Sequence, residues 1–158
     1  MNRVPLTLKG EIRIREQLTH LKSHERQKIR QALEEARAHG DLKENAEYHA
    51  AKEAQGIMEA KISYLEQQLQ ASTVIDVAHL PNHGKVVFGA TVVLENIETD
   101  ELVTYQIVGE VESDIDQGLI SFTSPIARAC IGNQAADIIS VETPKGIIEY
   151  EIKSIDLV

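Results

Sequence analysis

Apolar side chains recur at steps of three and four in the first half of the chain and alternate like a β-strand in the second half. The helical pattern runs from about residue 7 to residue 69, a stretch without proline. Its first part has apolar or small residues at Ile14, Leu18, Leu21, Ala32 and Ala36, with Ile29 and Leu33 broadening the stripe. Its second part has the heptad spacing of a coiled coil, with one polar insertion, at Tyr48, Ala51, Gln55, Met58, Ile62, Leu65 and Leu69. We therefore predict two long amphipathic helices.

A short interruption at residues 39–42 separates the two helical runs. Thr7 is a suitable N-cap for the first helix. Gly40 can adopt the left-handed conformation that ends a helix, and Asp41 can begin the next one. Because the connection is so short, the helices are expected to fold back as an antiparallel hairpin. About 30 residues per arm would give a rod of roughly 45 Å.

The second half of the chain contains five runs rich in β-branched residues, at 86–97, 102–109, 119–122, 137–142 and 147–152. Turn residues separate these runs, with a tight turn expected at 144–146. Residues 125–131 are predicted to form one short helix, because Ser124 can cap it and Pro125 suits its first position. The fold class is therefore α+β. We expect a coiled-coil hairpin over 1–75, with its tip at 39–47, and a small antiparallel-sheet domain over 76–158.

The net charge of −9 is unevenly distributed along the 158 residues. Residues 1–75 contain 12 Lys+Arg and 11 Asp+Glu, and residues 76–158 contain 4 and 14, so the two parts carry +1 and −10. The acidic part should be repelled by nucleic acid phosphates. Any contact with RNA or DNA is therefore expected in the hairpin, although a merely solvated acidic domain is the simpler interpretation of the charge alone.

One cysteine, Cys130, excludes an internal disulfide and a cysteine-based zinc site. The first residues lack the apolar run of a signal peptide, and no stretch has the length of a membrane span. We predict a cytoplasmic protein that does not bind membranes. A hairpin that buries its own seam also favours a monomer.

Acidic residues are concentrated at the predicted hairpin tip, where Asp41, Glu44 and Glu47 lie close together. Two interpretations fit Asp41 and Glu44. Their spacing is that of a capping box, in which both carboxylates accept hydrogen bonds from backbone N–H groups at the helix N-terminus. Alternatively, the pair could bind part of a Mg²⁺ site, since Mg²⁺ is held by one or two carboxylates together with waters and substrate phosphates. Two carboxylates alone would hold Mg²⁺ weakly, so another protein would have to complete such a site.

Several segments together resemble the Gre family of bacterial transcript cleavage (transcription elongation) factors, nearest to its GreA type. The similarity lies in TLKG (7–10), GDLKENAEYHAAKE (40–53), VIDV (74–77), GKVVFGATV (84–92), YQIVG (105–109) and SPIARACIG (124–132). These segments extend over essentially the whole chain. The resemblance implies a hairpin that enters the secondary channel of RNA polymerase and a globular domain of FKBP-like topology that docks at the channel entrance.

The resemblance also implies roles for individual residues. Asp41 and Glu44 correspond to the family's tip acids, which help to hold the second catalytic Mg²⁺ of the polymerase and to orient the attacking water. The hairpin is then an accessory to cleavage of backtracked RNA in the polymerase active site, and it binds no metal stably alone. Arg37 and Lys52 are candidates for contact with the RNA 3′ end. The docking segment corresponds to Ser124, Pro125, Ile126, Ala127 and Arg128.

Three other functions are weighed against this one. An inhibitory homologue would enter the same channel without promoting cleavage, but the intact pair Asp41 and Glu44 argues against it. A prolyl isomerase of FKBP-like topology would need an aromatic-lined pocket, and the second half of the chain offers few aromatic residues. A chaperone-like arm would not need acids concentrated at its tip.

Overall fold

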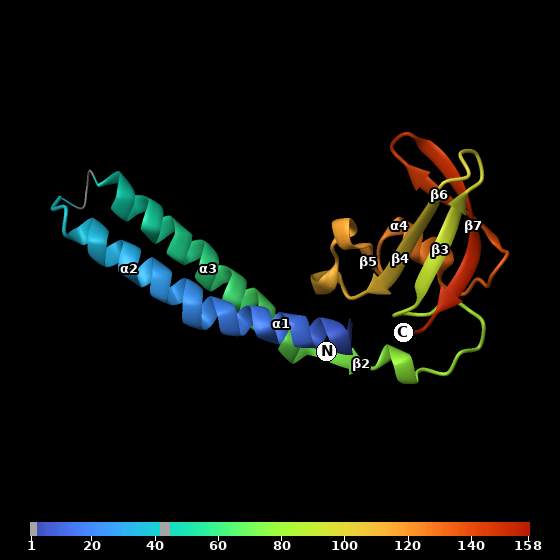
Figure 1. The fold of residues 1–158 in the computed structure, drawn as a ribbon, viewed down its shortest axis with the longest axis horizontal. Helices are drawn as coiled ribbons and strands as arrows, with labels where there is room; N and C mark the ends of the chain where they lie inside the picture. Colours follow the sequence, from blue (N-terminus) through green and yellow to red (C-terminus); the bar gives the residue numbers. More distant parts are fainter. Residues whose placement is uncertain (1–2, 42–44) are drawn as a thin grey trace. The chain divides into compact units, whose positions relative to one another are not determined.

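The computed structural model describes residues 3–41 and 45–158, and it forms two compact units (Figure 1). One unit consists of residues 12–71, and the other combines residues 1–11 with residues 72–158. The predicted division between residues 75 and 76 differs in its treatment of the N-terminal residues and stays a prediction. Among the described residues, no helix is long and apolar enough to cross a membrane.

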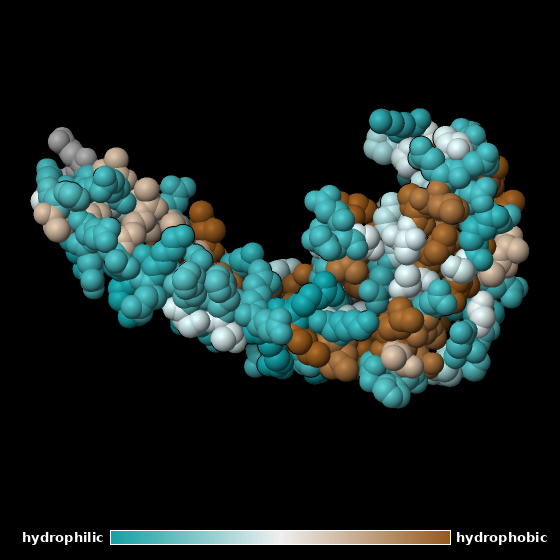
Figure 2. All heavy atoms as spheres, viewed as in Figure 1, coloured by the Kyte–Doolittle hydropathy of each residue, from teal (hydrophilic) through white to brown (hydrophobic). Residues whose placement is uncertain are grey.

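The first unit is the predicted helical hairpin. Its first arm runs through α1 (Leu8–His20), η1 (Leu21–Glu25) and α2 (Arg26–Arg37), and its second arm is α3 (Ala46–Ala71). The two arms lie side by side along α2 and α3 (Figure 1). The buried seam is formed by Ile14, Leu18, Leu33, Ala36, Ala51, Met58, Ile62 and Leu65. The visible face of the hairpin is mostly hydrophilic, as expected when the apolar stripes face each other (Figure 2).

The first arm differs from the prediction at one turn, η1, which is a π-helix. Leu33 lies in the seam, whereas Ala32 is exposed and not part of it. The side chains of the first arm that are turned inward here are spaced four residues apart, at Leu21, Glu25, Ile29 and Leu33. A π-helical turn adds a residue to the helix, and steps of four shift a heptad seam around the helix surface. The added residue therefore lets the first arm keep facing the regular heptads of α3.

The second unit contains a two-stranded parallel sheet that the sequence analysis did not predict. It joins β1 (Val4–Thr7) to β2 (Ser72–Ile75), so residues from the two ends of the hairpin are paired. Each strand has only four residues, which is too short for a clear alternation of apolar and polar positions. A short 3₁₀ turn, η2 (Val77–His79), follows β2.

The main sheet has the five predicted strands in the order β5-β4-β3-β7-β6. Their bounds are β3 (Thr91–Asn96), β4 (Leu102–Val108), β5 (Leu119–Ser121), β6 (Ile138–Thr143) and β7 (Gly146–Asp156). All neighbouring pairs are antiparallel except β4 and β5, which are parallel. The connection between these two strands contains η3 (Glu110–Glu112) and η4 (Ile115–Gln117).

One face of this sheet is covered by α4 (Pro125–Cys130), and the core lies between them. The buried side chains of the core are Val86, Ala90, Val92, Leu94, Ile107, Ile120, Ala127, Cys130, Ile139, Val141 and Ile152. The strand β3 begins at Thr91, five residues after Val86, where the sequence predicted its start. Gly89 causes this shift, because its φ of +90° places a turn within the apolar run.

A buried carboxylate connects the start of α1 to the loop after β4. Glu112 accepts hydrogen bonds from the backbone N–H of Thr7 at 3.0 Å, the backbone N–H of Gly109 at 2.8 Å, and the Thr7 hydroxyl. The Thr7 hydroxyl in turn accepts from the N–H of Gly10 at 3.0 Å, which confirms Thr7 as the N-cap of α1. The carboxylate is buried with its acceptor positions occupied, so its burial is compensated by hydrogen bonds.

This network explains why glycine is found at position 10. A Cβ atom at Gly10 would overlap the carboxylate of Glu112. We expect Gly10→Ala to lower the free energy of unfolding by about 1–3 kcal/mol, as overpacking of a buried site does. Urea unfolding followed by circular dichroism measures this change.

The matched control is Gly56→Ala, in the middle of α3. A Cβ atom there would have nothing within 4 Å. This substitution should raise the free energy of unfolding by about 0.5–1 kcal/mol, because alanine is the better helix former. Equal effects of the two substitutions would contradict the proposed contact between Gly10 and Glu112.

Candidate functional site

The tip of the helical hairpin is the segment between α2 and α3, and it begins where α2 ends. The N–H groups of His39 and Gly40 donate to the carbonyls of Ala36 and Arg37, each at 3.2 Å. Gly40 has a φ of +105°, in the region that favours glycine. The predicted helix-ending function of Gly40 is therefore confirmed, and Asp41 follows directly as an exposed residue.

Asn45 closes the tip from the other arm. Its side-chain amide donates to the carbonyl of Ala36 at 2.6 Å, and its side-chain oxygen accepts from the N–H of Tyr48 at 3.1 Å. The second bond has the geometry of an N-cap, and α3 begins at the next residue, Ala46. One neutral side chain thus caps α3 and ties it to the last turn of α2.

This arrangement corrects the predicted start of the second helix, while the capping box of Asp41 and Glu44 stays a prediction. Asp41 was expected to open the second helix, but α3 begins five residues later and Asn45 is its cap. Glu44 lies outside the described residues. The signal for Asn45 was present in the sequence, because asparagine is among the favoured N-cap residues. It was missed because the acid spacing suggested a capping box.

No complete metal site is found among the described residues of the tip. Within the residues that the structure describes, no group of three or more His, Cys, Asp or Glu side chains could hold a metal ion. The donor set fits a share of a Mg²⁺ site instead, since Mg²⁺ needs only one or two protein carboxylates when phosphates and waters supply the other oxygens. Asp41 and Glu44 would be those carboxylates.

The basic candidates lie near the tip on different arms. Arg37 is an exposed residue in the last turn of α2, where a cation suits the helix dipole. Lys52 is exposed on α3, with its ammonium 3.4 Å from the side-chain oxygen of Gln55 and 6.0 Å from the centre of the Tyr48 ring. Both side chains are exposed.

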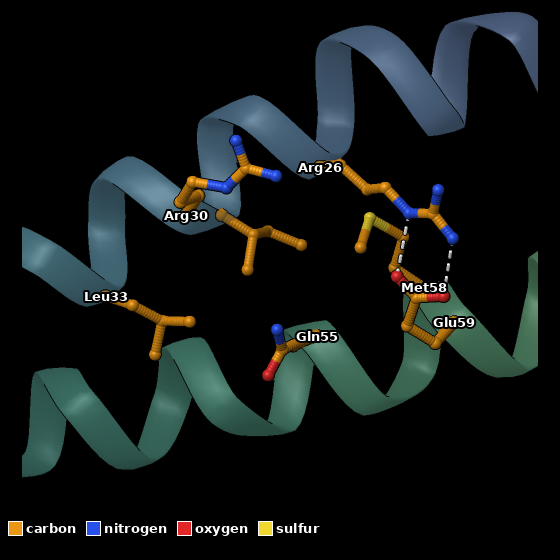
Figure 3. A pocket seen from close by; sticks show the side chains of 7 residues that line it. Arg26, Arg30, Leu33, Gln55, Met58 and Glu59 are labelled. Atoms are coloured by element: carbon orange, nitrogen blue, oxygen red, sulfur yellow. Dashed lines mark hydrogen bonds and ion pairs between the residues drawn. The ribbon is translucent and has the colours of Figure 1, made fainter.

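Further from the tip, a groove between the arms is lined by Arg26, Ile29, Arg30, Leu33, Gln55, Met58 and Glu59 (Figure 3). Arg26 binds the carboxylate of Glu59 through two hydrogen bonds of 2.9 Å. The hydrogen bond from Arg26 lowers the pKa of Glu59. Gln55 points from α3 towards this groove, which explains the polar insertion in the heptad pattern (Figure 3).

The predicted docking segment forms the start of α4. The hydroxyl of Ser124 accepts from the N–H of Ala127 at 3.3 Å, and Pro125 is in the first turn, so the predicted cap is confirmed. Ala127 is fully buried, whereas Pro125 and Arg128 are exposed. Burial raises the pKa of the Cys130 thiol to about 11, so this cysteine is not a reactive thiolate.

Comparisons with known proteins agree over both units. Two family models match the chain: "Transcription elongation factor, N-terminal" over residues 4–74 and "Transcription elongation factor, GreA/GreB, C-term" over residues 81–157. The chain is 57% identical to the transcription elongation factor GreA of Nitrosococcus oceani, over 98% of each chain. It is 54% identical to the same factor of Xylella fastidiosa, over 99% of each chain. Among solved structures, GreA factor homolog 1 of Thermus thermophilus is 30% identical, with coverage of 98% and 99% and a TM-score of 0.42.

The double function of Asn45 can be tested with two substitutions. Asn45→Ala removes both the cap and the bond to Ala36, and we expect a loss of about 0.5–2 kcal/mol in the free energy of unfolding. Hydrogen exchange of the Tyr48 amide should accelerate as well. Asn45→Asp keeps an acceptor for that amide but loses the donor to Ala36. If exchange at Tyr48 is unchanged in Asn45→Ala, Asn45 is not the cap.

Proposed function

We propose that this chain, which belongs to the GreA/GreB family of transcription elongation factors, binds RNA polymerase and stimulates the polymerase's own cleavage of backtracked nascent RNA. In this proposal the chain is an accessory factor and not itself the nuclease. Its hairpin enters the secondary channel of the polymerase and brings the tip acids to the active site.

The observation on which this proposal depends is the family match over both units, together with the exposed position of Asp41 at the end of the hairpin. Asn45, a neutral residue, provides the cap of α3 and the connection between the arms. The carboxylate of Asp41 is exposed beside this cap, where a metal ion or a water molecule can reach it. Glu44, three residues further on, would be the second acid.

The reaction is hydrolysis of one phosphodiester bond of the RNA. The oxygen of a water molecule attacks phosphorus, and the bond from phosphorus to the 3′ oxygen breaks. The upstream RNA keeps a 3′-OH for further elongation, and the released 3′ fragment keeps the phosphate. Bound Mg²⁺ would activate the water and stabilise the charge that develops on the phosphate. The carboxylates of Asp41 and Glu44 would bind the ion and accept a hydrogen bond from the water.

Other residues would position the RNA and the polymerase. The exposed cations Arg37 and Lys52 flank the tip, and they would contact phosphates near the RNA 3′ end. Pro125 and Arg128 are the exposed members of the predicted docking segment, so they would make its contacts with the polymerase. The buried Ala127 would instead support the segment from inside the core.

The alternative functions gain no support from the relatives. The chain is more than half identical over nearly its full length to proteins named as GreA elongation factors. An inhibitory homologue would bind the polymerase without promoting RNA cleavage, and the cleavage assay described next tests this directly.

The proposal is tested by RNA cleavage in a purified backtracked polymerase complex, with and without the protein. We expect Asp41→Ala and Glu44→Ala each to reduce the stimulated rate by at least about 100-fold, a loss typical of groups that stabilise the transition state. Affinity for the polymerase should change little, because neither substitution alters the seam. Raising Mg²⁺ should partly restore cleavage by Asp41→Asn, since mass action refills a weakened site.

The matched control is Glu47→Gln, which removes another carboxylate from the tip. Glu47 lies 3.8 Å from His39 in an exposed pair, so its loss should have little effect on cleavage. Cleavage of free RNA by the protein without polymerase would overturn the accessory function. A wild-type rate in the Asp41→Ala, Glu44→Ala double variant would show that the tip acids do not act in the reaction.

A further inference from the structure

One face of the main sheet carries exposed aliphatic residues. The strand register places Leu102, Glu95, Glu151 and Ile138 in a single row across β4, β3, β7 and β6. The neighbours of this row along the strands, such as Leu94 and Ile139, are buried in the core below α4. Because successive side chains point to opposite faces, the row lies on the face away from α4.

The same face continues onto the hairpin of β6 and β7. Residues 146–149 of β7 pair with β6 but not with β3, whose pairing with β7 ends at Asn96 and Tyr150. This part of the hairpin extends beyond β3 (Figure 1). Ile147 lies there opposite Glu142, next to the inward pair of Ile148 and Val141. We call this surface the open face and define it by Glu95, Leu102, Ile138, Ile147, Glu149 and Glu151.

The exposure of the aliphatic residues on the open face is large. Leu102 is 61% exposed, Ile138 is 59% exposed and Ile147 is 65% exposed. On this face the aliphatic residues alternate with carboxylates, since Glu95 and Glu151 lie between Leu102 and Ile138 in the row. Exposed apolar groups bordered by polar ones can mark an interaction surface. None of these three residues contributes to the core described above.

The charge on the open face determines which partner it suits. Lys153 is bound by Glu95 at 3.0 Å and by Glu151 at 2.6 Å, and a second cation, Lys145, is exposed in the turn that joins β6 to β7. Glu142 and Glu149 are exposed, and they lie on the part of the β6–β7 hairpin that extends beyond β3. The face therefore has an excess of negative charge, within a part of the chain that carries −10. A second copy of the chain and a nucleic acid would both be repelled, whereas a basic protein segment would be attracted.

We infer that the open face binds a basic segment of RNA polymerase whose cationic side chains alternate with aliphatic ones. This inference rests on the proposed function, and it adds a second contact on the face of the sheet opposite α4. The aliphatic groups of the segment would cover Leu102, Ile138 and Ile147. Its cations would pair with Glu142 and Glu149.

Site-specific photocross-linking with the full-length protein and core RNA polymerase tests this inference. A photoreactive amino acid is placed at Ile147, and the same group is placed at Ile115 as the control. Ile115 is also 65% exposed, but it lies in η4 beside β5, at the opposite edge of the sheet. We expect a cross-link from position 147 to a polymerase peptide rich in Lys or Arg, and a much weaker one from position 115.

Binding affinities provide the second measurement. The variant Glu142→Lys, Glu149→Lys should raise the Kd for polymerase by about tenfold or more, because like charges then face each other. The effect should shrink as salt concentration rises. The control Glu110→Lys, Asp116→Lys makes the same change in net charge away from the open face, and it should have a clearly smaller effect.

The outcomes separate the two proposals. If the wild-type protein binds polymerase but position 147 gives no polymerase cross-link, or the two charge variants behave alike, the inference is wrong and the proposed function stands. A cross-link from position 147 to a second copy of the chain would also overturn the inference. If the wild-type protein does not bind polymerase at all, both the proposed function and the inference fail.

Discussion

Packing between the two arms of the hairpin is the interaction on which the rest of the site depends. A helix as short as α2 is marginally stable alone in water. It is held by burial of Leu33 and Ala36 against α3, where Ala51 and Met58 are buried in turn. Each large aliphatic side chain contributes about 1.5–3 kcal/mol when fully buried. Among the described residues from 37 to 50 no side chain is buried, so this seam and the bonds of Asn45 hold the end of the hairpin to which Asp41 belongs.

The polar residues that stabilise the fold are different from the acid that is proposed to act in the reaction. Asn45 caps α3 and binds the end of α2 without a formal charge. At the other end of the first arm, a buried acid has a supporting function, because Glu112 accepts from Thr7 and Gly109. Buried polar groups of this kind are stable because their hydrogen bonds are made within the protein. Asp41, in contrast, is exposed at the tip, where a ligand can reach its carboxylate.

Much of this architecture could be predicted from the sequence, and the exceptions have physical reasons. The period of three and four identifies both arms, and the β-branched runs identify all five strands of the main sheet. The π-helical turn at Leu21–Glu25 was missed because a single added residue only disturbs the period. The strands β1 and β2 were missed because four residues give too little alternation, and the cap was assigned to Asp41 because its spacing to Glu44 fits a known motif. The tip chemistry itself came from resemblance to a family, since one carboxylate pair is compatible with either a cap or a metal.

The central claim is that a rod of fixed length delivers the tip acids to the polymerase active site. The most direct test adds one heptad to each arm at matching positions of α2 and α3, which moves the tip outward by about 10 Å and preserves the seam. The measurement is the rate of RNA cleavage in a backtracked polymerase complex, compared with the wild-type protein at saturating concentration. Our account predicts that the lengthened protein folds and binds polymerase but no longer stimulates cleavage. A wild-type cleavage rate from the lengthened, fully bound protein would contradict it.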